Sequence, residues 1–350
     1  MGDRLTQSMR ASHVLALLFV IASLGLAAFG AATGDTFYLR LGTEALIFAG
    51  LALSVDVLLG YSGALSLGQA LYFGIGAYVS ALMLLKVPSF WLAMGAAFVV
   101  TLISSIIGGL IANRVRGVYF ALITFGLAQV MAKVVYNTRE LGASDGMIGI
   151  PVVRIGLGSF SVSADNAAGF FLIVLAIIMA FYALTAYLLD TPFGRVLTAL
   201  KANEKRVPFL GYSVWRARMA AYVLAGLIAG MSGALYPMLR GFVSPELMFF
   251  ATSGNAVISV VLGGVGTLIG AIYGSVLLVI LKSVVGSWTE HHLIIIGLLF
   301  MLCVMFLPRG LAGLVRPRIE ALLRRDSGMP PDDNKSDSIG SSASKSGSAS

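Results

Sequence analysis

Three polar side chains lie within long apolar stretches of this sequence. Charged residues in such stretches are costly and are candidates for function. Asp56 lies one helical turn before Gly60, where it could line a solute path, pair with a basic residue or extend toward the inner surface. Glu44 lies near the outer end of the same stretch, within reach of interfacial water, and Gln69 is a candidate path-lining amide. The chemistry that these residues suggest is recognition of a solute or an ion inside a membrane.

Patterns for catalysis are missing from the sequence. It contains no GxxxxGK[ST] phosphate loop, no GxSxG elbow and no HExxH pair. Glu290-His291-His292 is a single run without a second group of ligands, which favours a solvated loop over a metal site. Cys303 is the one cysteine, so no intrachain disulfide can form. We therefore expect no catalytic residue, metal or cofactor, and any ATP hydrolysis must come from another chain.

Two apolar stretches, far apart in the chain, are interrupted by glycines in a similar way. The first break contains Gly60 and Gly63, and the second contains Gly263, Gly264 and Gly266. Irregular backbone is tolerated in a bilayer only where protein or a water-filled cavity covers it. Glycine-interrupted segments at matching positions of two halves therefore indicate where a solute passes. We predict an internal repeat with a substrate path beside both breaks.

The composition is that of a polytopic membrane protein. Of 350 residues, 58% are hydrophobic and 11% are charged, with a mean hydropathy of +0.92. Soluble domains carry roughly a quarter charged residues. Because a span needs about 20 apolar residues, the sequence predicts an all-α fold with about ten transmembrane helices. They lie near residues 14–32, 42–60, 66–85, 90–112, 118–136, 168–189, 218–239, 246–262, 267–286 and 292–308.

The basic residues between these spans are unevenly distributed. If the N-terminus is inside, fourteen lie in cytoplasmic segments and five on the other side. The positive-inside rule therefore places both termini in the cytoplasm. This count requires the stretch from Met248 to Lys282 to be divided at the second glycine break, which puts both breaks on the same side. Whether the repeats are parallel or inverted stays open.

The predicted transmembrane domain covers residues 14–315 and follows a short cytoplasmic segment at residues 1–13. The apolar run from Val14 to Ala32 exceeds the roughly 7 to 15 residues of a signal-peptide core, so we interpret it as a retained span. From Asp326 to Ser350 the chain is polar, with almost nothing apolar to bury. This composition predicts a disordered tail at residues 326–350.

The cytoplasmic segment at residues 190–217 is too long for a simple hairpin and predicts a helix of its own. Thr191 suits the N-cap and Pro192 the first helical position. An apolar face follows, and Pro208 with Gly211 would end the helix. The apolar face comprises Val196, Leu197, Leu200 and Val207. Such an amphipathic helix suits docking to a soluble partner or lying on anionic lipid, and spacing does not decide between the two.

The external loop at residues 137–167 is the other long connection. It contains Ser144, Asp145 and Gly146, and its Asp-Gly and Ile-Pro pairs indicate turns. A structured loop at this position could cover a pore mouth or meet a solute-delivery protein. The alternative interpretation is a plain cluster of turns.

Four stretches of the sequence resemble the permease subunits of branched-chain amino acid ABC transporters, most closely the LivM-like member of the pair. The similarity runs from about Ala45 to Leu314. The stretches are Leu58 to Gln69 with Phe73 to Tyr78; Tyr119 to Thr124 with Ser144 to Gly146 and Gly149 to Pro151; Phe193 to Arg195 with Leu210 and Gly211; and Val261 to Thr267 with Pro308 to Leu311. Asp56 stands where the family often has Asn, and Gln69 where it often has His. Lys205 to Pro208 replaces a stretch that is usually Ala-rich.

The resemblance implies the ABC importer permease fold, a LivH-like second permease subunit, two cytoplasmic ATPase subunits and an extracytoplasmic solute-binding protein. It implies that the segment at 190–217 is a coupling helix for the ATPases, which favours docking over lipid binding. The corresponding coupling residues are Phe193, Gly194, Arg195, Leu200, Glu204, Leu210 and Gly211. Ser144, Asp145 and Gly146 would lie on the face toward the binding protein. The implied location is the plasma membrane of a prokaryote.

The function predicted from these observations is translocation of leucine, isoleucine and valine by an ATP-driven importer, with no nucleic-acid partner. A permease of the same family that imports urea or short amides is one alternative. The other is an ion-coupled secondary transporter with Asp56 or Glu44 as its proton site. The long cytoplasmic segment argues against that alternative, because a secondary transporter needs no ATPase contact.

Overall fold

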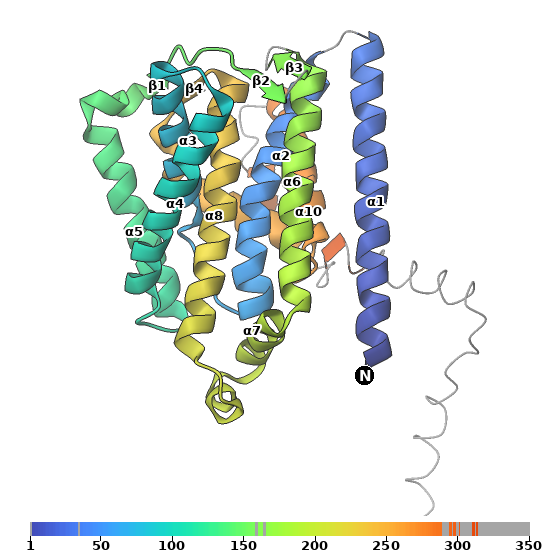
Figure 1. Ribbon diagram of the computed structural model, residues 1–350, viewed down its shortest axis with the longest axis vertical. Coiled ribbons are helices and arrows are strands. Elements are labelled where there is room, and N and C mark those ends of the chain that lie inside the picture. The colour runs from blue at the N-terminus through green and yellow to red at the C-terminus, as the bar shows by residue number, and fades with distance from the viewer. Residues whose placement is uncertain are drawn as a thin grey trace, which may run out of the picture.

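The computed structural model describes residues 2–33, 36–157, 160–163 and 166–288, with residues 294, 295, 297, 298, 301, 310, 311 and 313. Long helices run side by side, and short strands lie at the end of the bundle opposite the N-terminus (Figure 1). The predicted span at 292–308 lies mostly outside the described residues. Glu290-His291-His292, Cys303 and the tail lie entirely outside them.

The element order begins with the helices of the first half. These are α1 (Gly2–Thr33), α2 (Thr36–Asp56), the π-helix η1 (Val57–Ser62), α3 (Gln69–Lys86), α4 (Phe90–Ala112) and α5 (Val118–Asn137). Short elements follow: η2 (Arg139–Leu141), η3 (Ala143–Asp145), β1 (Met147–Ile148), β2 (Arg154–Leu157) and β3 (Phe160–Ser163). The second half contains α6 (Ala167–Asp190), α7 (Pro192–Asn203), η4 (Glu204–Leu210), α8 (Val214–Arg240), β4 (Phe242–Val243), η5 (Pro245–Met248), α9 (Phe250–Gly263) and α10 (Ile269–Trp288).

Nine of the predicted spans have a counterpart among the described helices. Seven helices are long and apolar enough to cross a bilayer, and two shorter apolar helices cover Val14–Gly30 and Phe250–Gly263. The helix α1 begins at Gly2, well before the predicted start. At 1.5 Å per residue the 14 residues of α9 extend about 21 Å, too short to cross alone. The chain from Gly241 to Phe249 precedes it as a short strand and a 3-10 turn instead of a longer helix.

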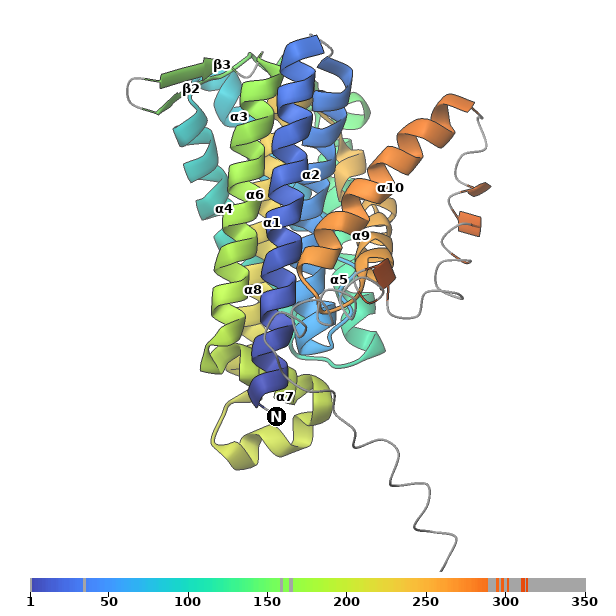
Figure 2. The same ribbon diagram turned by 90° about the vertical axis from the view of Figure 1, so that its right-hand side faces the viewer.

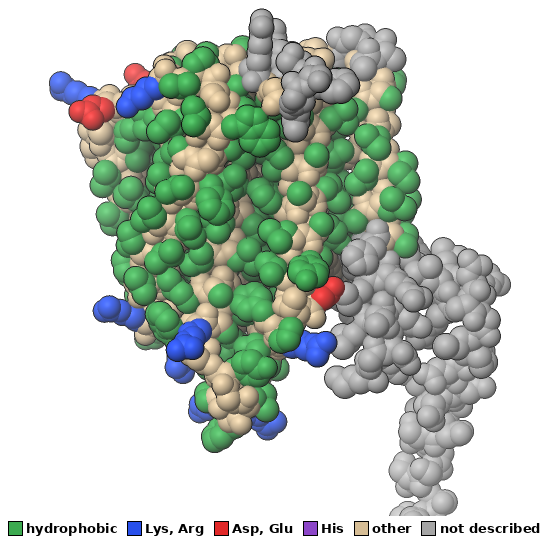
Figure 3. Space-filling view, viewed as in Figure 1, with side chains coloured by type: hydrophobic (Ala, Val, Ile, Leu, Met, Phe, Trp, Pro, Cys, Tyr) green, Lys and Arg blue, Asp and Glu red, His purple; other side chains and the backbone are tan. Residues whose placement is uncertain are grey.

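The helices divide into an inner and an outer group. Most of α2, α3 and α8 is buried inside the bundle, whereas only a third of the most apolar part of α4 and of α5 is buried. The exposed positions are apolar: Trp91, Phe98 and Ile103 project outward from α4. Hydrophobic side chains cover the middle of this face, and the charged side chains gather toward its two ends (Figure 3). A band of this kind fits a helical protein whose outer helices face lipid.

Glycines allow the inner helices to approach closely. Gly76 of α3 faces the carbonyl group of Gly230 in α8, and Gly233 faces the carbonyl group of Phe73. Tyr72 donates a hydrogen bond to the hydroxyl of Tyr222 at 3.0 Å between the same two helices. In a membrane the hydrophobic effect does not drive helices together, because lipid tails are as apolar as the side chains. Transmembrane helices therefore associate through small residues that allow close packing and through interhelical hydrogen bonds.

The short strands were not predicted. β1 pairs with β4 of the chain after α8 (Met147 with Val243), and β2 pairs with β3 (Arg154 with Ser163), both antiparallel. Strands of two to four residues are too short to show an alternating pattern in the sequence. They lie at the end of the molecule opposite α7 (Figure 1).

We expect Gly76→Leu to destabilise the protein by about 3 kcal/mol or more, because the new side chain occupies the space of a backbone carbonyl that cannot move alone. The measurement is thermal unfolding and the yield of monodisperse protein in detergent. Gly95→Leu in α4 is the matched control, since nothing lies within 4 Å of an added Cβ there. Equal stability of the two variants would contradict this account of the packing.

Candidate functional site

The carboxylate of Asp56 connects the two glycine breaks. Its Oδ1 accepts a hydrogen bond from the backbone nitrogen of Gly266 at 2.6 Å, and its Oδ2 accepts one from that of Leu268 at 2.9 Å. Asp56 is fully buried. One side chain at the end of α2 therefore holds the turn between α9 and α10, 210 residues away in the sequence. Both breaks lie at the same end of the bundle, as the topology predicted.

The backbone at this contact requires glycine. Gly60 packs against Gly266, and a Cβ at position 60 would lie 2.7 Å from the Gly266 Cα and 2.5 Å from Asp56 Oδ1. The first break is a π-helix that ends at Gly63, whose φ is 70°. In the second break Gly264 and Gly266 have φ values of 111° and 79°, which side chains disfavour. Gly263, at the end of α9, packs against the Gly270 carbonyl.

Gln69 begins α3, just after the non-helical residues 63–68. It is fully buried, and its Nε2 donates to Ser66 Oγ at 3.4 Å. Its Oε1 accepts no hydrogen bond from the part of the chain that the structure describes. The next residue, Ala70, donates its backbone N–H to Ser253 Oγ of α9 at 3.2 Å. The start of α3 is therefore joined to α9 by this hydrogen bond, just as the end of α2 is joined by Asp56 to the turn between α9 and α10.

The segment at residues 190–217 forms α7 with the predicted start, and the predicted apolar face is divided between α7 and η4, which contains Val207. Val196, Leu197, Leu200 and Val207 are buried. Thr191 occupies the N-cap position, although its hydroxyl donates to the Leu188 carbonyl instead of accepting from the helix. The predicted end at Pro208 and Gly211 is wrong for the α-helix, which stops at Asn203 and continues as the 3-10 helix η4. The Asn203 side chain accepts from the Lys205 backbone at 3.1 Å and thereby starts η4.

Lys201 of α7 contacts the first glycine break directly. Its Nζ donates a hydrogen bond to the Gly60 carbonyl at 2.6 Å. Its stem lies against Gly63, with Cγ 3.0 Å from where a Cβ of that glycine would stand. The break, α7 and the turn after α9 thus form one continuous set of contacts. Sequence reasoning placed Lys201 among the cytoplasmic charges and did not connect it with the break.

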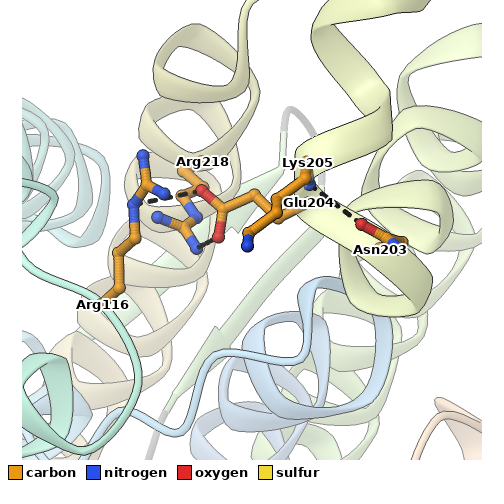
Figure 4. A network of polar contacts seen from close by, with 5 residues as sticks. All are labelled: Arg116, Asn203, Glu204, Lys205 and Arg218. Atoms are coloured by element: carbon orange, nitrogen blue, oxygen red, sulfur yellow. Dashed lines mark hydrogen bonds and ion pairs between the residues drawn. The ribbon is translucent and has the colours of Figure 1, made fainter.

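Glu204, at the start of η4, connects this segment to two other elements (Figure 4). It forms ion pairs with Arg218 of α8 at 2.6 Å and with Arg116, in the connection before α5, at 3.2 Å. The other predicted coupling residues differ in exposure. Phe193 is half-buried, Gly194 packs against the Leu189 backbone, and Arg195, Leu210 and Gly211 are exposed.

The residues predicted for the external face lie together at the other end of the bundle. Ser144 and Asp145 are exposed in η3, and the Ser144 hydroxyl donates to Asp145 Oδ1 at 3.1 Å. Gly146 is buried against the Val243 carbonyl, where β1 meets β4. The loop is thus an ordered structure that shares a strand pair with the chain after α8, which contradicts the interpretation as plain turns.

A charged cavity of about 630 Å³ lies between α2, α8, α9 and α10. Glu44 and Arg240 form an ion pair of 2.5 Å in its wall, and Arg40 and Lys282 also line it. Sequence reasoning considered Glu44 alone, near the interface, and did not find its partner. The sequence does contain the partner, Arg240, as a basic residue at the outer end of another span. The 196 positions between Glu44 and Arg240 leave no local pattern that connects them.

Comparison with known proteins identifies the family of the chain. A family model described as the permease component of the branched-chain amino acid transport system matches residues 37–304. The chain belongs to this permease family. It is 30% identical to the LivM permease of Salmonella typhimurium over 301 residues, covering 80% of this chain and 71% of the relative. No solved structure matches the chain.

Two further relatives show how broad the similarity is. The LivM permease of Escherichia coli is 29% identical over 330 residues, covering 88% of this chain and 78% of the relative. The LivH permease of Escherichia coli is 24% identical over 288 residues, covering 78% and 92%. The resemblance drawn from the sequence is therefore confirmed: this permease is similar to both kinds of membrane subunit and more closely to LivM.

We expect Asp56→Ala to lower the free energy of unfolding of the permease by about 3 kcal/mol, because it leaves two buried backbone donors without an acceptor. Asp56→Asn should have an intermediate effect, since an amide offers one acceptor oxygen in place of two. Thermal unfolding in detergent measures both. The control is Asp190→Ala, which removes an exposed carboxylate at the end of α6. An Asp56→Ala variant as stable as this control would exclude the connecting role.

Proposed function

We propose that this permease is one of two membrane subunits of an ATP-driven importer of leucine, isoleucine and valine. The relatives are named as high-affinity branched-chain amino acid permeases, and both LivM and LivH are among them. The single observation that carries the ATP-driven part is the hydrogen bond from Lys201 of α7 to the first glycine break. A secondary transporter has no need of an amphipathic helix beneath the membrane that contacts the broken spans.

The proposed assembly has a LivH-like partner permease, two cytoplasmic ATPase subunits and an extracytoplasmic solute-binding protein. With α7 facing the cytoplasm, the N-terminus of α1 lies on the same side and the loop with Ser144 and Asp145 faces the binding protein (Figure 2). This orientation agrees with the excess of basic residues near α7. The membrane is the plasma membrane of a prokaryote, with both termini in the cytoplasm.

Coupling follows from the contacts. Closure of the ATPases on ATP displaces α7, and Lys201 transmits this displacement to the Gly60 carbonyl. Asp56 then transmits it to the turn between α9 and α10. Because the two breaks touch through glycines, the paired segments can move together against the partner permease with little steric resistance.

The 3-10 helix η4 supplies an exposed apolar surface for the ATPase. The Phe209 side chain is 90% exposed, and Leu210 and Tyr212 beside it are also exposed. The surface lies at the tip of the segment that projects beyond the bundle (Figure 1). Exposed aromatic residues on a soluble projection favour docking into a protein groove. Lipid binding is the other outcome that the test below distinguishes.

Reconstitution tests the function as a whole. We expect vesicles that contain this permease, its partner permease and the ATPases to take up leucine only when ATP and the binding protein are both present. Urea with its own candidate binding protein is the control for the alternative substrate class. Leucine uptake driven by a pH gradient, with this chain alone and no ATPase, would show that the permease is a secondary transporter.

Two substitutions separate docking from coupling. We expect Phe209→Ala to reduce co-purification of the ATPase subunits at least five-fold, because it removes the most exposed aromatic side chain of the docking surface. Lys201→Met should leave co-purification intact and reduce leucine transport per ATP at least five-fold, because it removes the donor to Gly60.

Phe98→Ala on the lipid-facing side of α4 is the control for the first variant, and Lys133→Met on α5 for the second. If Phe209→Ala instead weakens binding to anionic vesicles and leaves ATPase co-purification unchanged, η4 is a lipid-binding segment. Unchanged coupling in Lys201→Met would refute the proposed transmission path.

A further inference from the structure

Four charged side chains line the cavity between α2, α8, α9 and α10. Arg40 and Glu44 come from α2, Arg240 from α8 and Lys282 from α10. Glu44 and Arg240 form the one ion pair in this cavity among the described residues. Arg40 and Lys282 therefore leave it with two more cations than anions. Charges inside a membrane span are costly unless they are paired, so a cluster of this kind indicates a ligand.

The cavity also has the size and lining of a small-molecule site. Its volume of about 630 Å³ falls within the roughly 300 to 1,000 Å³ of ligand pockets. Phe48 and Leu278 supply apolar surface, and Asn255 and Ser259 of α9 supply polar groups. Such a combination of a few charges with apolar surface fixes the orientation of a bound molecule and accommodates a hydrophobic part.

We propose that this cavity binds an amino acid zwitterion with an apolar side chain on its passage through the permease. The α-carboxylate faces Arg40 and Lys282, the α-ammonium faces Glu44, and the side chain lies against the apolar wall. This assignment rests on the proposed import function and names a site for its substrate, which neither the comparisons nor the glycine motifs assign.

The presence of charged groups of both signs favours a zwitterion over the alternatives. Its carboxylate pairs with the cations that have no partner in the cavity, and its ammonium pairs with Glu44. A simple carboxylate offers nothing to Glu44, and an uncharged amide such as urea cannot replace the pairing of either group. The cavity chemistry thus selects amino acids from the substrate classes that the sequence left open.

The position of the cavity connects it to the coupling contacts. Ser259 lies one helical turn before Gly263, and Ser275 lies fewer than two turns after the start of α10. The turn between these helices is the one that Asp56 holds. A displacement of that turn therefore changes the distance between the two walls of the cavity, which is how a site of this kind would release its ligand.

Thiol protection in the assembled transporter tests the site. Asn255→Cys in a Cys303→Ala background gives one cysteine in the cavity wall, because Cys303 is the one native cysteine. We expect L-leucine to slow its modification by a methanethiosulfonate reagent in the complex without ATP. Isocaproate, which lacks the ammonium, and isoamylamine, which lacks the carboxylate, should protect only at much higher concentrations.

Charge-removing variants then assign the ends of the ligand. Glu44→Gln should raise the leucine concentration for half-protection at least ten-fold and leave that of isocaproate unchanged. Lys282→Gln should raise the leucine concentration for half-protection by a similar factor and leave the isoamylamine concentration for half-protection unchanged. Lys133→Gln, outside the cavity, is the matched control and should change none of the three.

Two results would overturn the inference. The first is that leucine gives no protection. The second is that Glu44→Gln and Lys282→Gln each weaken protection by leucine, isocaproate and isoamylamine equally, as expected if the two residues only stabilise the structure. Leucine import by the wild-type complex without protection of Asn255→Cys would refute the site and leave the proposed function intact. Protection without ATP-dependent import would support the site and refute the proposed function.

Discussion

The contact between Asp56 and the backbone of Gly266 and Leu268 is the constraint on which the centre of this permease depends. A buried carboxylate is costly in a bilayer, and here two backbone N–H groups compensate it. The same backbone groups belong to an irregular turn, which would itself be costly in lipid without a partner. Each feature thus stabilises the other, and Gly60 and Gly266 bring the two segments close enough for the bonds to form.

Everything that the permease is proposed to do is arranged around this contact. On one side Lys201 of α7 reaches the carbonyl of Gly60, and Glu204 fixes the following segment to Arg116 and Arg218. On the other side α9 and α10 leave the held turn and form two walls of the charged cavity. In the proposed coupling, a displacement of α7 would in this way reach the cavity.

The sequence predicted the elements better than the contacts between them. Hydropathy located nine helices, and the loop charges required the division between α9 and α10 that the structure contains. Three of the four residues predicted for the apolar face lie buried on α7, because helical periodicity is a local property. The end of α7 and the four short strands were missed. Asn203 begins a 3-10 helix through a side-chain contact, and strands of two to four residues carry no periodic signal.

What the sequence by itself determined is a helical membrane protein with two glycine breaks on one side and an amphipathic helix on that same side. These properties follow from composition, period and charge, which act over one helix at a time. Only the tertiary structure decided that Asp56 holds the second break, that Lys201 touches the first, and that Glu44 meets Arg240. Such pairs join residues as many as 212 positions apart, and their formation depends on which helix faces pack together.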